Sequence, residues 1–218
     1  LELKTTAGVV ITASHNPPEY NGYKVYGEDG GQCPVADSDR ITEYISRIDD
    51  MFHIDSMPLD EAERSGLLTY IGDELDEIYF KKVEGLCLIP DIVKQQADTL
   101  NIVYTPLHGT GNIPVRRVLK DLGYKNIHVV PQQEHPDPAF STVKAPNPEE
   151  RQCFDLAMAL ANQKNADLIL ATDPDSDRLG VAVRDDSNDF TILSGNEIGC
   201  LLMDYVLSQK QPSFTGDE

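Results

Sequence analysis

The sequence predicts an α/β protein with doubly wound sheets, mixed or parallel, and helices on both faces. Short apolar strand patterns alternate with helical patterns along the middle of the chain. Strands are expected at Ile102–Tyr104, Ile127–Val130 and Leu168–Ala171, and helices at Val115–Leu122 and Glu149–Asn162. Strands and helices that alternate at these lengths favour βαβ units and therefore a doubly wound, parallel arrangement.

The N-terminal part begins with Val9-Val10-Ile11, a β-branched run with the composition of a buried strand. A second strand is expected at Tyr23–Tyr26, and Gly30-Gly31-Gln32 then turns the chain. Asp37 or Ser38 is expected to cap a helix. One apolar face of that helix is formed by Ile41, Tyr44, Ile45 and Ile48. The acidic residues 49–66 are expected to be irregular.

The rest of the chain supplies two more helices and a long loop. One helix is expected from Asp73 to about Leu86, and a proline-bearing loop at Pro131–Pro148. Ser194 and Glu197 have the spacing of a capping box and precede a helix with an apolar face. We expect part of a first domain at residues 1–70, a complete α/β domain at 71–190, and the start of a third domain at 191–218.

The composition excludes some partners. The chain has 37 acidic and 18 basic residues, a formal net charge of −19. Nucleic acid and anionic membrane are therefore not expected as partners, because phosphate binding needs basic patches. No apolar run approaches the roughly 18 residues of a membrane span, and no signal-peptide pattern opens the chain. The four cysteines are far apart and form no CxxC pair, which is typical of reduced thiols. We expect a cytoplasmic protein.

The stretch from Gly8 to Lys24, GVVITASHNPPEYNGYK, carries a candidate nucleophile. Pro17 and Pro18 end any regular strand, so Ser14 lies on the loop that follows the first strand. Loops at the carboxyl ends of strands are where α/β proteins place their chemistry. An ordinary Ser-Asn-Pro turn is the alternative interpretation of these residues alone.

An acidic loop, Asp173-Pro174-Asp175-Ser176-Asp177-Arg178, directly follows the expected strand at 168–171. Three carboxylates within five residues repel one another unless a cation or a proton neutralises them. Carboxylate oxygens are hard ligands that suit Mg²⁺ or Mn²⁺. The loop lacks the glycine and the distant glutamate of an EF-hand. A solvated acidic turn is the remaining alternative.

A glycine-rich turn, Thr105-Pro106-Leu107-His108-Gly109-Thr110-Gly111, joins an expected strand to a helix. Backbone amides and the helix dipole at such a turn can hold an anion. The spacing is neither that of a P-loop nor that of GxGxxG. A tight strand-to-helix turn without a ligand is an equal alternative.

Three runs of the sequence resemble the α-D-phosphohexomutases, a family that includes phosphoglucomutase and phosphomannomutase. Thr12–Pro17, followed by Asn21-Gly22-Tyr23-Lys24, is similar to the phosphoserine loop of that family. Residues 173–178 match its Asp-x-Asp-x-Asp-Arg metal loop, and residues 106–111 are similar to its Pro-Leu-His-Gly-Thr-Gly run. The resemblance implies three-layer α/β domains.

The resemblance also implies the central chemistry. Ser14 would carry the phosphoryl group that passes to and from the sugar. One Mg²⁺ ion would be held by a phosphoserine oxygen together with Asp173, Asp175 and Asp177. Glucose 1,6-bisphosphate would serve as activator, and a small-molecule hexose phosphate would be the substrate.

Four more residues are candidates for catalysis. Arg178 would lie beside the phosphoserine and, with Lys24, would offset negative charge. Lys24 would also move the proton of the sugar hydroxyl. His15 is adjacent to the serine in the motif, and His108 is a candidate for proton transfer or phosphate contact.

The implied reaction moves a phosphoryl group between C1 and C6 of a hexose phosphate through a phosphoserine. Glucose 1-phosphate and glucose 6-phosphate are the expected pair, and mannose or pentose phosphates are alternatives within the class. Two other classes stay open. One is a metal-dependent sugar phosphatase with water as acceptor, and the other is a sugar-phosphate-binding module without turnover.

The chain departs from the family in its extent. Family members have four domains, and the third and fourth carry a Gly-Glu-x-Ser sugar loop and an Arg-x-Ser-Gly-Thr phosphate loop. Neither run occurs in this sequence. We interpret the chain as an internal fragment whose partners are the remaining domains of the same polypeptide. We expect the fragment by itself to be inactive as a mutase.

Overall fold

The computed structural model describes residues 1–210, and these residues form two compact units. The first unit contains Leu1–Thr12 and Gly22–Glu77. The second unit contains Ala13–Asn21 and the chain from Ile78 onward. The segment that carries Ser14 therefore groups with the second unit, although it follows a strand of the first. The domain limits expected from the sequence stay a prediction.

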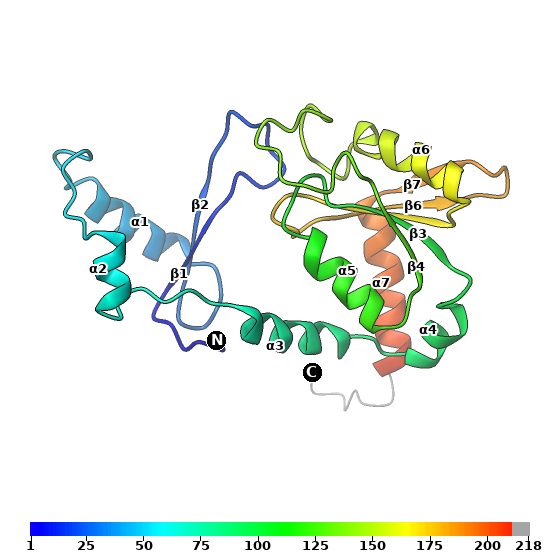
Figure 1. Ribbon diagram of the computed structural model, residues 1–218, viewed down its shortest axis with the longest axis horizontal. Helices are drawn as coiled ribbons and strands as arrows, with labels where there is room; N and C mark the ends of the chain where they lie inside the picture. The colour runs from blue at the N-terminus through cyan, green and yellow to red at the C-terminus, as the bar shows by residue number, and fades with distance from the viewer. Residues whose placement is uncertain (211–218) are drawn as a thin grey trace. The chain divides into compact units, whose positions relative to one another are not determined.

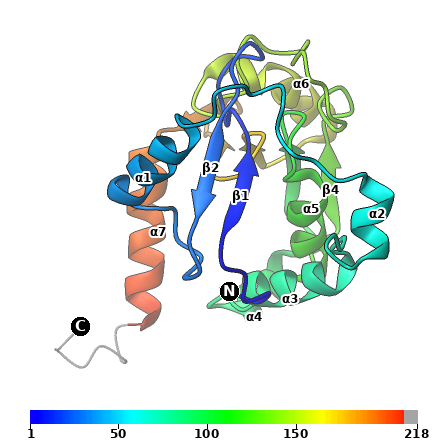
Figure 2. The same cartoon turned by 90° about the vertical axis from the view of Figure 1, so that its left-hand side faces the viewer.

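The first unit contains a two-stranded antiparallel ribbon, β1 (Gly8–Ile11) and β2 (Tyr23–Tyr26), shown side by side in Figure 2. Both strands were predicted, but the burial predicted for the first was wrong. Val9 is 49% exposed, Val10 41% and Ile11 71%. The physical reason is that two strands alone bury little on either face. Composition predicts the strand but does not show whether another layer of the protein covers it.

The helices of the first unit depart from the prediction at two places. Helix α1 (Val35–Ile45) begins before Asp37 and Ser38, because the amides of both residues already donate to the Pro34 carbonyl at 3.0 Å. Neither residue is therefore the cap. Helix α2 (Leu59–Arg64) lies in the region predicted to be irregular, directly after Pro58. Proline at a helix start is favourable because its missing amide would have no partner there.

Helix α3 (Asp73–Glu84) confirms the helix predicted from Asp73, two residues shorter at its end. The short helix α4 (Pro90–Gln96) was not predicted. Helix α7 (Gly195–Lys210) confirms the helix predicted after the capping box. The Ser194 amide donates to the Glu197 carboxylate at 2.7 Å, and the Glu197 amide donates to the Ser194 hydroxyl at 3.3 Å.

The second unit is built on a five-stranded sheet with the order β4-β3-β5-β6-β7. Strands β3 (Asn101–Thr105), β4 (Asn126–Val129) and β5 (Leu168–Thr172) are the three predicted strands, and they are parallel. Strands β6 (Leu179–Arg184) and β7 (Phe190–Leu193) were not predicted and pair antiparallel. The sheet is therefore mixed, in agreement with the predicted fold class.

Two crossover helices cover opposite faces of this sheet. Helix α5 (Asn112–Asp121) connects β3 to β4, and α6 (Asp155–Lys164) connects β4 to β5 on the other side of β3. Because crossovers are right-handed, two connections that run in opposite directions place their helices on opposite faces. Figure 1 shows α6 on one side of the sheet and α5 on the other. The predicted helices on both faces are confirmed here.

Helix α6 begins later than predicted. A 3₁₀ turn, Arg151–Phe154, precedes it, so Asp155 is its first residue. The physical reason lies in Asn147, whose carbonyl accepts the Glu150 amide at 2.9 Å and whose side chain accepts the Glu149 amide at 3.2 Å. These bonds hold residues 147–150 in a turn. The core under α6 contains Val103, Phe154, Ala157, Ala161, Ile169 and Ala182, all fully buried.

Within residues 1–210 no helix combines the length and the apolar character that crossing a membrane requires.

Candidate active site

The site lies where the strand order of the sheet reverses. Strands β3 and β5 are parallel neighbours, and the chain continues from β3 to β4 on one side and from β5 to β6 on the other. Loops after such a pair of strands diverge and leave a crevice, the usual ligand position in open α/β sheets. The turn 105–111 follows β3 and the acidic loop 173–178 follows β5. The sheet thus brings the two loops to the same edge.

The two loops are in direct contact. The Thr110 amide and hydroxyl both donate to the Pro174 carbonyl, at 2.8 Å and 3.0 Å. At Gly109 a Cβ atom would come within 2.4 Å of the Pro174 Cα atom. Only glycine allows this approach, which explains the glycine in the turn.

The acidic loop gathers its three carboxylates. Asp173 is buried, Asp175 is half-buried and Asp177 is exposed, and one oxygen of each lies within 4.8 Å of the others. The loop turns tightly, since the Ser176 amide donates to the Asp173 carbonyl at 3.0 Å and Ser176 has φ of 60°. The predicted ligands are therefore adjacent in space.

The electrostatics of Asp173 reflect this crowding. Its pKa is raised to about 6, mainly by burial and in addition by the neighbouring Asp175 carboxylate through a hydrogen bond and charge repulsion. Two donors oppose the rise: the Arg178 amide at 2.9 Å and the Ser14 hydroxyl at 3.1 Å. The pKa is thus raised chiefly because burial disfavours the ionised form of the carboxyl group.

Ser14 lies directly against the acidic loop. Its hydroxyl donates to the Asp173 Oδ2 atom at 3.1 Å, across 159 residues of sequence. The His15 Nδ1 atom lies 3.2 Å from the same hydroxyl oxygen. Ser14 also has φ of 54°, in the left-handed region. Non-glycine residues in this region cost free energy and cluster at functional sites.

Two further candidates, Arg178 and Lys24, lie in different surroundings. The Arg178 guanidinium pairs with the Glu149 carboxylate at 3.5 Å. Lys24 lies on β2 of the first unit, opposite Val10, so it belongs to the other compact unit. The sequence indicated Glu149 only as the start of a helix and not as the partner of Arg178, because an exposed glutamate carries no signal of its partner.

His108 is nearly buried, at 6% exposure, and both of its ring nitrogens face the loop 131–148. Gln133, from that loop, is fully buried beside the turn and accepts a hydrogen bond from the Thr105 hydroxyl at 2.6 Å. Sequence reasoning missed Gln133 as well. A single glutamine in a proline-bearing loop does not reveal burial.

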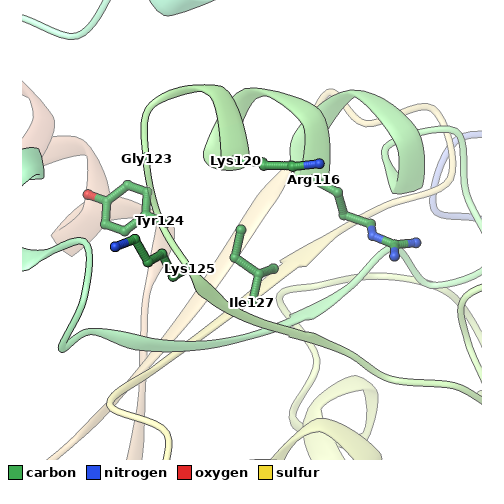
Figure 3. Close-up of a pocket in the computed structure, with 6 residues that line it drawn as sticks. All are labelled: Arg116, Lys120, Gly123, Tyr124, Lys125 and Ile127. Atoms are coloured by element: carbon green, nitrogen blue, oxygen red, sulfur yellow. The ribbon is translucent and has the colours of Figure 1, made fainter.

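A surface pocket of about 570 Å³ lies elsewhere in the second unit, beside α5 and the start of β4. Figure 3 shows its lining residues, which are Arg116, Lys120, Gly123, Tyr124, Lys125 and Ile127. Two of its cations are already neutralised, since Arg116 pairs with Glu134 and Lys125 with Asp98, each at 2.6 Å. Among the described residues, none of the predicted site residues lines this pocket.

The acidic loop fits a small divalent cation. Mg²⁺ binds oxygen at about 2.0–2.1 Å, so two oxygens on opposite sides of the ion are roughly 4.2 Å apart. The carboxylate oxygens, which lie within 4.8 Å of one another, need only a small contraction to share an ion. All the donors are hard oxygens, the type that Mg²⁺ and Mn²⁺ prefer.

The comparisons of this sequence with known proteins all point to one protein family. The chain matches "Phosphoglucomutase/phosphomannomutase, alpha/beta/alpha domain I" over residues 1–51 and "alpha/beta/alpha domain II" over residues 77–186. A phosphoglucomutase from Staphylococcus epidermidis is 42% identical over 210 residues, which is 96% of this chain and 37% of that protein. The chain thus spans little more than a third of the curated relative it matches.

Solved structures share the fold. A phosphoglucomutase/phosphomannomutase family protein from Burkholderia thailandensis aligns with a TM-score of 0.64 at 24% identity, over 94% of this chain and 38% of that one. The Aspergillus fumigatus N-acetylphosphoglucosamine mutase in complex with GlcNAc-6P and magnesium aligns with a TM-score of 0.56 at 17% identity. That alignment covers 95% of this chain and 49% of that one.

Proposed function

Because the chain belongs to the phosphoglucomutase/phosphomannomutase family, we propose that it is the phosphoserine and metal-binding part of a phosphohexomutase. The parent protein transfers a phosphoryl group between C1 and C6 of a hexose phosphate. Glucose 1-phosphate and glucose 6-phosphate are the proposed pair, since the 42% identical relative is named phosphoglucomutase.

The observation that carries the proposal is the contact between Ser14 and Asp173, whose oxygen atoms are 3.1 Å apart. A serine that is to carry a phosphoryl group must lie beside the cation whose positive charge stabilises that group. In this proposal the ligands of the cation are Asp173, Asp175 and Asp177 of the acidic loop. Bound there, Mg²⁺ would offset the negative charge on the transferring oxygens.

The protein's own residues have distinct proposed roles. Ser14 is the nucleophile and phosphoryl carrier, and its phosphorylated form adds roughly −1.5 to −2 charge at neutral pH. His15, 3.2 Å from the Ser14 hydroxyl, is placed to orient that hydroxyl. Arg178, the last residue of the acidic loop, is held by the bond from its amide to Asp173 and by its pair with Glu149. Lys24 remains a proposed proton carrier for the sugar.

The activity belongs to the whole polypeptide. Recognition of the sugar and of its distal phosphate is assigned to the remaining domains of the parent, which the chain does not include. Orientation of the reacting groups supplies about 7–11 kcal/mol in favourable cases. We expect most of this contribution to be missing from the 218-residue chain.

The test is to incubate the intact parent with Mg²⁺ and glucose 1,6-bisphosphate and to map phosphate by mass spectrometry. One phosphate on Ser14 is expected, together with conversion of glucose 1-phosphate to glucose 6-phosphate. Label on another residue would contradict the role of Ser14. Release of inorganic phosphate without isomerisation would indicate a sugar phosphatase, and neither activity would indicate a binding module.

A further inference from the structure

Both ring nitrogens of His108 are used by the loop 131–148. Nδ1 lies 2.8 Å from the His135 carbonyl oxygen, and Nε2 lies 2.8 Å from the Thr142 hydroxyl oxygen. A carbonyl only accepts, so Nδ1 carries a proton, and in the neutral ring Nε2 accepts from the Thr142 hydroxyl. The Thr142 oxygen in turn accepts from the Gln133 side-chain amide at 3.2 Å. The His108 ring is thus hydrogen-bonded through both nitrogens to the loop 131–148.

The loop 131–148 also holds the turn 105–111 in an unfavourable backbone conformation. Leu107 and His108 have φ of 45° and 65°, both in the left-handed region. Neither is a glycine, so the surrounding contacts must compensate. The His108 amide donates to the Gln133 carbonyl at 2.9 Å, and the Thr105 hydroxyl donates to the Gln133 side chain. Contacts from the loop 131–148 thus determine the shape of the turn.

The turn is coupled to the acidic loop directly after His108. Gly109 lies against the Pro174 backbone, and Thr110 donates two hydrogen bonds to the Pro174 carbonyl. Pro174 stands between Asp173 and Asp175. A displacement of the turn therefore moves the backbone that sets the distance between these two carboxylates.

We propose that His108 is a positioning residue that holds the turn 105–111 against Pro174 and so fixes the carboxylates of the acidic loop for a divalent cation. The inference rests on the metal site of the proposed function. Engagement of both ring nitrogens by the loop 131–148 favours this role over proton transfer to a sugar or contact with a phosphate. Outer residues that orient metal ligands typically contribute about 10–100-fold to affinity.

The first arm of the test uses no metal. Amide hydrogen exchange is measured by NMR on the 218-residue chain and on its variants. In His108→Ala, exchange at the Thr110 amide should rise about tenfold or more, because its bond to Pro174 is loosened. The Arg184 amide, bonded to the Asp167 carbonyl at 3.1 Å, should not change. His53→Ala, in an exposed part of the first unit, is the matched imidazole control.

The second arm measures Mn²⁺ affinity by electron paramagnetic resonance. His108→Ala should bind Mn²⁺ about 10–100-fold more weakly than the parent chain, and His53→Ala should bind equally well. His108→Gly separates the ring from the backbone, since glycine accepts positive φ without strain. If the ring is the anchor, His108→Gly should weaken binding as His108→Ala does.

Each outcome decides the proposal. Wild-type exchange at Thr110 in folded His108→Ala, or wild-type behaviour of His108→Gly, would overturn the positioning role. If His108→Ala does not fold, Thr142→Val, which removes only the hydroxyl partner, must accelerate Thr110 exchange, and an unchanged rate would overturn the role as well. A parent chain that shows the Thr110 effect but binds no Mn²⁺ would refute the metal site and leave the coupling of the loops standing.

Discussion

Gly109→Ala tests whether close packing of the turn against the acidic loop sets the geometry of the metal site. The new Cβ atom would lie 2.4 Å from the Pro174 Cα atom and 2.7 Å from the Pro174 carbonyl oxygen. Ordinary van der Waals contact begins at 3.4 Å, so Pro174 must recede by about 1.0 Å, the difference between 3.4 and 2.4. Because the contacts are with backbone, no change of side-chain rotamer can relieve them.

Such a shift should affect both stability and binding. Overpacking that moves backbone typically costs about 1–3 kcal/mol of unfolding free energy. Mg²⁺ demands near-ideal octahedral geometry at about 2.0–2.1 Å, so a carboxylate displaced by about 1 Å leaves the coordination shell. We expect Gly109→Ala to bind Mg²⁺ at least about tenfold more weakly, a loss of roughly 1.4 kcal/mol.

The assay is titration calorimetry with Mg²⁺, together with urea unfolding followed by circular dichroism. Gly199→Ala in α7 is the matched control, because its Cβ atom would meet nothing within 4 Å. Alanine is favoured over glycine in a helix interior by about 1 kcal/mol, so this control should gain stability and keep its Mg²⁺ affinity. Wild-type Mg²⁺ affinity in Gly109→Ala would refute the reasoning.

Four other predictions address the site and the core. Asp175→Asn should sharply weaken Mg²⁺ binding in calorimetry because it removes ligand charge, and an unchanged affinity would exclude the ligand role. Ser14→Ala in the parent should gain no phosphate from glucose 1,6-bisphosphate by mass spectrometry, with an unchanged circular dichroism spectrum. Burial raises the pKa of Tyr104 from 10.0 to about 12, against the opposing effect of its hydrogen bond to Thr172. Because the pKa is raised in the folded state, this contribution to the free energy of unfolding is complete below pH 10 and falls by roughly 2–3 kcal/mol as the pH rises to about 12. Tyr104→Phe should flatten this part of a pH series of urea unfolding curves. The 218-residue chain should turn over glucose 1-phosphate far below an ordinary enzyme's roughly 10 s⁻¹ in a coupled assay.

The elements that the sequence predicted are those with strong local patterns. Strands β3, β4 and β5 were predicted from apolar runs, and α7 from the spacing of Ser194 and Glu197. Helix α4 was missed because its seven residues give no apolar periodicity. The exposure of Val9, Val10 and Ile11 was missed because burial depends on which layers cover a strand, and the strand's own residues do not encode that.

The sequence by itself determined the fold class, the succession of strands and helices along the middle of the chain and the two loops that carry candidate chemistry, because these follow from residues that are neighbours along the chain. Tertiary structure alone decided which side chains meet. The Ser14–Asp173 contact spans 159 residues, and Arg178 pairs with Glu149. The ring of His108 lies against Thr142, while Lys24 lies in the other unit. The physical reason is that contacts between segments far apart in the sequence depend on how strands and loops are arranged in space. The parallel pairing of β3 with β5, for example, brings the turn 105–111 and the acidic loop to one edge of the sheet.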